Sequence, residues 1–198
     1  RLTAAQRARV FAAFGPDKDM QLYQRGIRRR LAPMLSGDRR RLELAYSLLF
    51  SLPGTPVIRY GDEIGMGDDL RLPERDCART PMQWSTEPQA GFSRAKKLVL
   101  PVISGGPYGY QRVNAADQRP DPDSLLNWTE RMIRMRKEVP EIGWGEFKVV
   151  DAGQPGVLAL QYSWRNDEVL VIHNLRDESV QARLQLSGPG GKTIVSLL

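Results

Sequence analysis

Residues 52–66 constrain the fold of this 198-residue chain more than any other stretch. Pro53-Gly54 ends a helical pattern, the apolar pair Val57-Ile58 follows, and Gly61-Asp62-Glu63 opens a polar loop. This order of helix, tight turn, short buried strand (residues 55–60) and polar loop is typical of a βα barrel. Because the loops that follow the strands build the active-site face of such a barrel, we expect Gly61-Asp62-Glu63 to lie at its mouth.

Apolar residues recur at helical spacing in three stretches, which predicts helices over residues 4–14, 39–52 and 125–139. Suitable N-caps precede them, and a Gly-Pro, a Pro-Gly and a proline follow them. The expected N-caps are Thr3, Asp38, and either Asp123 or Ser124. The expected apolar faces consist of Ala8, Phe11 and Phe14 in the first helix; Leu42, Ala45, Tyr46, Leu48, Leu49, Phe50 and Leu52 in the second; and Leu125, Trp128, Met132, Met135 and Val139 in the third.

Residues 61–122 show little periodicity and many glycines and prolines, and residues 16–37 are expected to form a shorter irregular connection. An irregular segment as long as 61–122 is uncommon in a compact domain unless it is functional or disordered. Its aromatic residues argue against disorder, because disordered segments contain few of them. We therefore expect an ordered excursion that faces a substrate.

After Gly143-Trp144-Gly145 the pattern changes from helical to strand-like. Short β-rich runs separated by turn-forming residues indicate an antiparallel sheet or small sandwich. The expected strands are 147–150, 157–164, 169–174, 180–186 and 193–198. The chain is thus expected to be a mixed α and β protein with a first part over residues 1–142 and a C-terminal β-domain over 143–198.

Four motifs carry a resemblance to a known family. The run GTPVIRYGDEIGM at 54–66 resembles the last barrel strand and following loop of glycoside hydrolase family 13, the α-amylase superfamily. The run RTPMQW at 79–84 resembles the signature of its α-glucosidase and trehalose synthase branch, and GIRRRLAP at 26–33 and SLLNW at 124–128 narrow the likeness to trehalose synthase-like proteins. The resemblance implies the C-terminal part of a (β/α)8 TIM barrel followed by a β-domain. It also implies a parent enzyme that interconverts maltose and trehalose by retaining glucosyl transfer, with hydrolysis as a side reaction. No phosphate-binding loop or metal-ligand cluster is visible in the sequence, so we expect no cofactor or metal.

The catalytic carboxylates that such chemistry needs are not evident in this sequence. Retaining glycoside chemistry uses two carboxyl groups roughly 5–5.5 Å apart, and the adjacent Asp62 and Glu63 at a strand end would point in opposite directions. In the family the nucleophile, the acid/base and a third aspartate lie on other strands, whose motifs this sequence lacks. We expect Asp62 and Glu63 to organise the barrel mouth, with direct sugar contact as the alternative. The chain alone is expected to be inactive.

Arg79 is the first candidate for substrate binding, because a guanidinium offers a rigid fork of donors to two sugar hydroxyls or a carboxylate. The competing interpretation is a loop arginine paired with Asp76, and the resemblance favours the substrate role. The full set of expected substrate-binding residues is Tyr60, Glu63, Asp76, Arg79, Gln83 and Trp84. His173 and Cys77 lack suitably spaced partners and are expected to be structural or unreactive.

The net charge of +6 comes largely from an arginine cluster at residues 25–41. No nucleic-acid module or interleaved aromatic pattern accompanies it, so we expect a solvated surface, or one that meets further protein, rather than a nucleic-acid site. Arg59, within the expected strand, should meet an acidic group from other strands.

Partners and location follow from the same features. Apolar barrel edges need cover, so we expect docking onto an N-terminal barrel half or self-association. No apolar run approaches membrane-spanning length, no signal-peptide pattern is visible, and the single Cys77 excludes an internal disulfide. We therefore expect a cytoplasmic protein that does not bind membranes. The alternative functions are a non-catalytic module that binds α-glucans or protein partners and, less favoured, a basic nucleic-acid binder.

Overall fold

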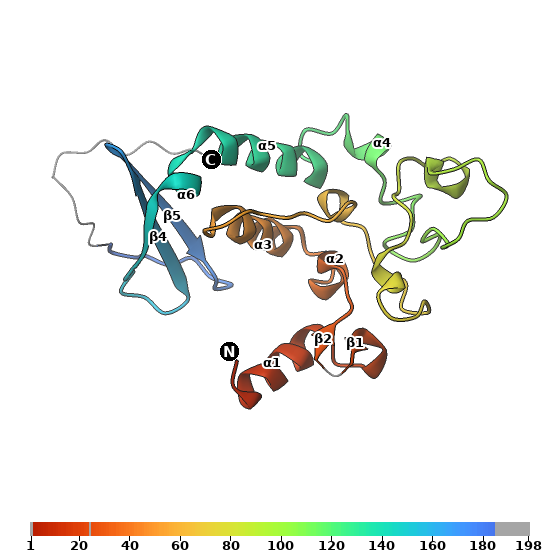
Figure 1. Cartoon of the computed structure of the whole chain (residues 1–198), viewed down its shortest axis with the longest axis horizontal. Helices are drawn as coiled ribbons and strands as arrows, with labels where there is room; N and C mark the ends of the chain where they lie inside the picture. Colours follow the sequence, from red (N-terminus) through yellow and green to blue (C-terminus); the bar gives the residue numbers. More distant parts are fainter. Residues whose placement is uncertain (1, 24, 185–198) are drawn as a thin grey trace. The chain divides into compact units, whose positions relative to one another are not determined.

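The computed structural model describes residues 2–23 and 25–184, which form two compact units (Figure 1). The first unit comprises the residues up to Glu43 together with Ile58–Thr129, and the second comprises Leu44–Val57 together with the residues from Glu130 onward. The domain boundary expected at residue 142 remains a prediction.

The first helix is confirmed as α1 (Ala4–Phe14). Thr3 and Gln6 form a capping box, in which Gln6 N donates to Thr3 Oγ1 at 3.2 Å and Thr3 N donates to Gln6 Oε1 at 2.8 Å. Gly15 follows as the C-cap. No residue of α1 is buried, so its start and end are determined by local signals rather than by packing.

Residues 16–37 are more regular than expected. They contain the 3-10 turn η1 (Lys18–Met20), the strands β1 (Gln21–Leu22) and β2 (Gly26–Ile27), which pair antiparallel, and the short helix α2 (Leu31–Met34). Strands of two residues are too short to show alternation in the sequence, which explains why the prediction was wrong here.

The second predicted helix is confirmed as α3 (Arg39–Ser51). Its buried apolar residues are Leu42, Tyr46 and Phe50, spaced four apart, whereas Leu52 is 43% exposed. The strand expected at 55–60 is wrong: these residues form no ladder, and Val57 is 78% exposed. A parallel strand exists only through hydrogen bonds to its neighbours, and no described residue pairs with this segment.

Residues 61–122 are irregular, as expected, and ordered around a small core. The segment contains the 3-10 turns η2 (Asp62–Ile64), η3 (Asp76–Ala78) and η4 (Pro88–Gly91) and the short helix α4 (Ala115–Gln118). Ile64, Met66, Met82 and Ala115 form the buried cluster, against which Val113 and Leu126 pack. Apolar burial thus holds together a backbone with little regular structure.

The third predicted helix is confirmed as α5 (Leu125–Glu138), with the Ser124 hydroxyl accepting from Asn127 N at 3.2 Å as its cap. Pro140 follows its end, and the short helix α6 (Glu141–Trp144) comes next. Of the predicted apolar face, Leu125, Met132 and Val139 are buried, while Trp128 and Met135 are half-buried.

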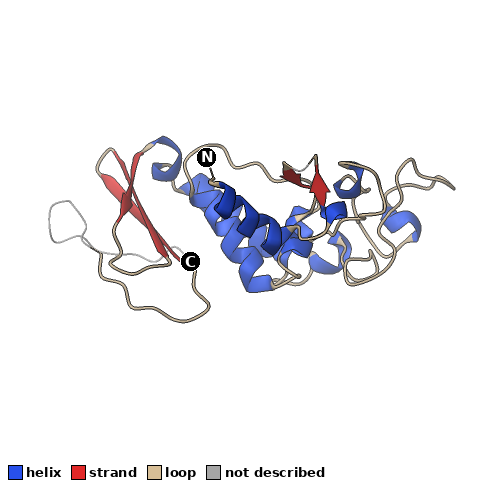
Figure 2. Ribbon diagram, turned by 90° about the horizontal axis from the view of Figure 1, so that it is seen from below, coloured by secondary structure: helices blue, strands red, loops and turns tan. Residues whose placement is uncertain are grey.

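The second unit contains a three-stranded antiparallel sheet in the order β3 (Glu146–Val150), β4 (Val157–Trp164) and β5 (Asp167–Asn174). Figure 2 shows these strands, with the β1–β2 hairpin, in red. The helix α6 contacts β4 and β5. Val139, Ile142, Leu160 and Tyr162 form the buried core at this contact.

Three of the five strands predicted for the β-domain are thus present. The strand expected at 180–186 is wrong for the described residues 180–184, which have no strand pairing. Leu184 packs on the cluster of Val150, Ala152 and Ala159 instead, so its apolar character serves a contact rather than a ladder. Residues 185–186 and the expected strand 193–198 lie outside the described residues.

Candidate functional site

Asp62 and Glu63 lie on a single 3-10 turn between two glycines with left-handed backbone. Gly61 has φ 85° and Gly65 has φ 74°. A Cβ atom on Gly61 would collide with the Met66 side chain, so the turn requires glycine there. The run Gly61-Asp62-Glu63-Ile64-Gly65 therefore determines the turn that presents both carboxyl groups.

Asp62 is held by a buried arginine. Arg30 Nη1 donates to Asp62 Oδ1 and to the carbonyl oxygen of Tyr60, both at 2.9 Å, and only 1% of the Arg30 side chain is exposed. The guanidinium also lies 5.3 Å from the centre of the Tyr60 ring, while that of Arg59 lies 5.7 Å from it. Cation–π contacts of this kind partly replace the water that buried guanidinium groups lose.

Burial raises the pKa values of both carboxyl groups on this turn. For Asp62 the nearby Arg30 opposes the rise. For Glu63 backbone N–H groups oppose it, while the charge of Asp62 adds to it. Asp62 is therefore an anchored structural carboxylate, and Glu63 is a half-buried acid beside it.

The arginines at 28–30 do not form the solvated basic surface expected from the sequence. Arg29 Nε donates to Asp68 Oδ2 at 2.9 Å, and Arg30 pairs with Asp62. Arg28 donates to backbone carbonyl groups of residues 70–74. Each of the three consecutive side chains thus holds a different part of the 60–74 segment, a use of positive charge that composition alone cannot reveal.

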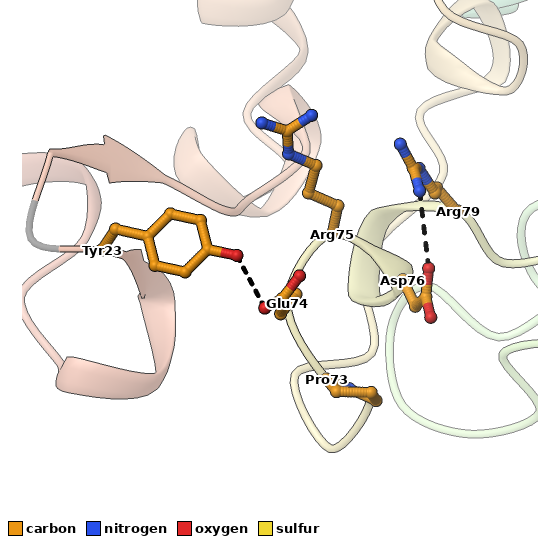
Figure 3. Close-up of a pocket in the computed structure, with 6 residues that line it drawn as sticks. All are labelled: Tyr23, Pro73, Glu74, Arg75, Asp76 and Arg79. Atoms are coloured by element: carbon orange, nitrogen blue, oxygen red, sulfur yellow. Dashed lines mark hydrogen bonds and ion pairs between the residues drawn. The ribbon is translucent and has the colours of Figure 1, made fainter.

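An open pocket of about 320 Å³ lies beside this segment. It is lined by Tyr23, Pro73, Glu74, Arg75, Asp76 and Arg79 (Figure 3). Tyr23 from the β1–β2 turn donates to Glu74 Oε1 at 2.6 Å, and this hydrogen bond is the main reason that the pKa of Tyr23 is raised. The pocket therefore offers carboxylate, guanidinium and phenol groups at one place, the hydrogen-bonding inventory that suits a polyhydroxylated ligand.

Within the pocket Arg79 Nη1 lies 3.7 Å from Asp76 Oδ1, across the turn η3. The side chains are 51% and 40% exposed. An ion pair this exposed contributes only about 0–1 kcal/mol. The alternative interpretation of Arg79 as a paired loop arginine thus describes its contact here, and that contact is weak enough for a ligand to displace.

The six predicted site residues fall into four places. Asp76 and Arg79 line the pocket, while Tyr60 and Glu63 belong to the turn around η2. Gln83 is fully buried and donates to the carbonyl oxygens of Val113 and Tyr108, whereas Trp84 is 47% exposed. The Tyr60 hydroxyl donates to Thr80 O at 3.0 Å, and this hydrogen bond links the η2 turn to the RTPMQW run that begins at Arg79.

Four residues that line the pocket were not predicted from the sequence: Tyr23, Pro73, Glu74 and Arg75. Tyr23 lies 51 positions before its partner Glu74, and no local sequence pattern predicts a contact over that separation. Pro73, Glu74 and Arg75 directly precede Asp76 in the sequence, so their proximity to a predicted site residue was the available signal.

The second unit holds a buried polar cluster that is remote from solvent. Ser51 Oγ and His173 Nε2 are 2.8 Å apart, and the two residues are 2% and 4% exposed. The Tyr162 hydroxyl donates to the carbonyl oxygen of Ser51, and burial lowers the pKa of His173. A serine–histidine pair this buried cannot meet a substrate, so the expected structural role of His173 fits its surroundings.

The described residues lack the features of two other classes of site. They contain no group of three or more histidine, cysteine, aspartate or glutamate side chains placed to hold a metal ion. None of the helices in the described part of the chain is long and apolar enough to span a membrane.

Comparison with known proteins gives a consistent result. Residues 28–145 match the family model described as "Alpha amylase, catalytic domain". The chain is 44% identical over 179 residues to a trehalose synthase of Pimelobacter sp. (strain R48), covering 87% of this chain and 31% of that protein. It is 43% identical over 178 residues to a trehalose synthase of Thermus thermophilus, covering 88% of this chain and 18% of that protein. The chain thus spans about a third or less of the length of these relatives.

Among solved structures, the trehalulose synthase MutB from Pseudomonas mesoacidophila MX-45 is similar in fold. The match has a TM-score of 0.61 and 24% identity, and covers 77% of this chain and 34% of that one. This likeness and the family model support part of a (β/α)8 barrel as the fold of the matched residues. The chain belongs to the α-amylase family, glycoside hydrolase family 13, and is similar to its trehalose synthases over most of its length.

Proposed function

We propose that this chain supplies part of the substrate-binding site of an α-glucoside-active enzyme that interconverts maltose and trehalose, with hydrolysis as a side reaction. The observation that carries the proposal is the pocket at Asp76 and Arg79, because Arg79 begins the RTPMQW run at 79–84. The similarity to trehalose synthases supports the choice of substrate.

The chemistry of the pocket suits this role. The Arg79 guanidinium offers two parallel N–H groups to vicinal sugar hydroxyls, and the carboxylates of Glu74 and Asp76 accept hydrogen bonds from hydroxyl groups. Trp84 does not line the pocket, but it ends the same RTPMQW run, is 47% exposed and offers an aromatic face on which a pyranose ring can stack. In the complete reaction an α-glucosidic bond is cleaved through a covalent glucosyl-enzyme, and the freed glucose attacks it again through another hydroxyl.

The carboxyl groups that form and resolve the glucosyl-enzyme are not assigned to this chain. Asp62 is committed to Arg30, and Glu63 follows it on the same turn. We therefore propose that the chain binds maltose weakly, with a Kd of about 1–10 mM, and does not turn it over alone. An N-terminal barrel half, or a second copy of the chain, is the proposed partner that completes the site.

The experiment is to incubate the purified chain with maltose and to follow trehalose and glucose by NMR. Maltose binding without product is expected. Trehalose formation would contradict the proposed inactivity and would make Asp62, Glu63, Asp68, Asp69 and Asp76 the first residues to substitute.

A second candidate is a non-catalytic α-glucan-binding module, which the exposed aromatic side chains of Trp84 (47%) and Phe92 (49%) favour. Longer maltodextrins would then bind much more tightly than maltose, and a Trp84→Ala, Phe92→Ala variant would lose that difference. The primary proposal instead predicts similar affinities for maltose and for longer glucans.

A further inference from the structure

We propose that Arg28 is a positioning residue of the sugar pocket: its guanidinium holds the backbone of residues 70–74 and thereby sets Glu74, Asp76 and Arg79. The inference deepens the proposed function and rests on it for the identity of the ligand. The contacts of Arg28 with residues 70–74 do not depend on which ligand the pocket binds.

Most of the N–H donors of the Arg28 guanidinium bind backbone carbonyl groups. Nη1 donates to the carbonyl oxygens of Leu72 and Glu74, both at 2.9 Å, and Nη2 donates to that of Leu70 at 2.6 Å. Nε donates to the carbonyl oxygen of Asp19. Alternate carbonyl groups of the 70–74 segment therefore converge on one side chain that can make five such hydrogen bonds.

The backbone of Arg28 is fixed from its other side. Its N–H donates to Met20 O at 2.9 Å, and its carbonyl oxygen accepts from the buried Cys77 thiol at 3.1 Å. Glu74 O lies 3.2 Å from the same sulfur, so the single thiol hydrogen is shared between the two carbonyl oxygens. Arg28 and Cys77 thus hold the Glu74 carbonyl group from two sides, at the point where the chain enters η3.

Two residues of the pocket adopt strained backbone conformations. Glu74 has φ 44° and Tyr23 has φ 51°, and neither is glycine. Such conformations cost on the order of 1 kcal/mol each and persist only when the surroundings enforce them. For Glu74 the enforcing contacts are those of Arg28 and Cys77, and they aim its carboxylate at the Tyr23 hydroxyl.

Lysine cannot replace this arrangement. An ammonium group places its three donors on one nitrogen, whereas the carbonyl groups of Leu70, Leu72 and Glu74 are bound by two different nitrogens of the guanidinium fork. Loss of Arg28 should therefore release the 70–74 segment and let Glu74 relax, which moves the walls of the pocket without removing any residue that lines it.

The test compares four variants of the full chain by two-dimensional amide NMR and maltose titration: Arg28→Met, Arg28→Lys, Arg79→Ala and the double substitution of Arg28→Met with Arg79→Ala. Arg25→Met is the control, because Arg25 is exposed, lies in the β1–β2 turn three positions before Arg28 and carries the same charge. We expect Arg28→Met to shift the amides of 70–79 and to weaken maltose binding about tenfold. Arg28→Lys should give an intermediate loss, and Arg25→Met should give none.

The double variant separates positioning from general destabilisation. If Arg28 acts through the pocket, Arg28→Met adds little to the loss caused by Arg79→Ala. Additive losses, or unchanged 70–79 amides in either Arg28 variant, would overturn the inference. If the unsubstituted chain binds no maltose, the proposed function fails, and the amide shifts alone decide whether Arg28 positions this segment.

Discussion

In the second unit, β3, β4 and β5 pair their backbone polar groups in one antiparallel ladder, whereas residues 60–74 of the first unit combine local backbone turns with carbonyl groups bound by arginine side chains. The carbonyl groups of Tyr60, Leu70, Leu72 and Glu74 accept hydrogen bonds from Arg28 or Arg30. The ladder is repetitive and leaves few polar groups available to a ligand. The arginine-held segment is irregular and can turn Glu74, Asp76 and Arg79 outward, which explains why the pocket lies there.

The largest expected effect is on the core beneath the ladder. Tyr162 is fully buried, stacks with Phe147 at 5.9 Å between ring centroids and donates to the Ser51 carbonyl group. Tyr162→Ala should lower the free energy of unfolding by about 4 kcal/mol, as measured by urea denaturation. Tyr162→Phe, which removes only the hydroxyl, is the control and should cost about 1 kcal/mol. Equal losses in the two variants would show that packing is unimportant here.

The next effect concerns the arginine-held segment. Asp62→Ala leaves the buried Arg30 guanidinium without its carboxylate and should destabilise the first unit by about 3 kcal/mol. Amide hydrogen exchange measures this locally, since protection should fall around 60–66 and not in the sheet. Protection lost uniformly over both units would contradict a separate mode of stabilisation.

A smaller, pH-dependent effect is expected in the second unit. Burial lowers the pKa of His173, so the unfolded chain binds a proton at this residue more readily than the folded chain does. Stability should therefore be full above about pH 6.5, fall as the pH drops from there to the folded-state pKa, and then level off. His173→Gln should remove this component from the pH dependence of the unfolding midpoint; an unchanged profile would contradict the assignment.

The smallest effect is expected at the exposed pair of Glu130 and Arg134. Glu130 Oε1 and Arg134 Nη2 are 2.7 Å apart, but the side chains are 61% and 66% exposed. Glu130→Ala should change the free energy of unfolding by less than about 0.5 kcal/mol. A loss comparable with that of Asp62→Ala would show that burial does not distinguish the two ion pairs.

The sequence predicted what local signals determine. Thr3 and Ser124 mark helix starts through their own hydrogen bonds, and β-rich runs bounded by turn-forming residues indicate β4 and β5. The strand predicted at 55–60 is absent because no described residue pairs with it. The hairpin of β1 and β2 was missed because strands of two residues show no sequence pattern.

The candidate site also contains residues that local sequence predicts and residues that only distant contacts place there. Arg79 could be predicted from the RTPMQW run and Asp76 as a carboxylate three positions before it, and both line the pocket. Tyr23 could not be, since its place there depends on a hydrogen bond to Glu74 across 51 positions of sequence. Within the basic cluster, Arg28, Arg29 and Arg30 were misinterpreted for a related reason, because acceptors of their side chains lie about 30 to 46 positions along the chain.

The most direct test of the central proposal is titration of the chain with maltose, followed by amide NMR and repeated with Arg79→Ala. The proposed function predicts saturable shifts at residues 74–79 in the unsubstituted chain and their loss in the variant. Shifts that are absent at saturating maltose, or that persist unchanged in Arg79→Ala, would contradict the assignment of this pocket to α-glucoside binding.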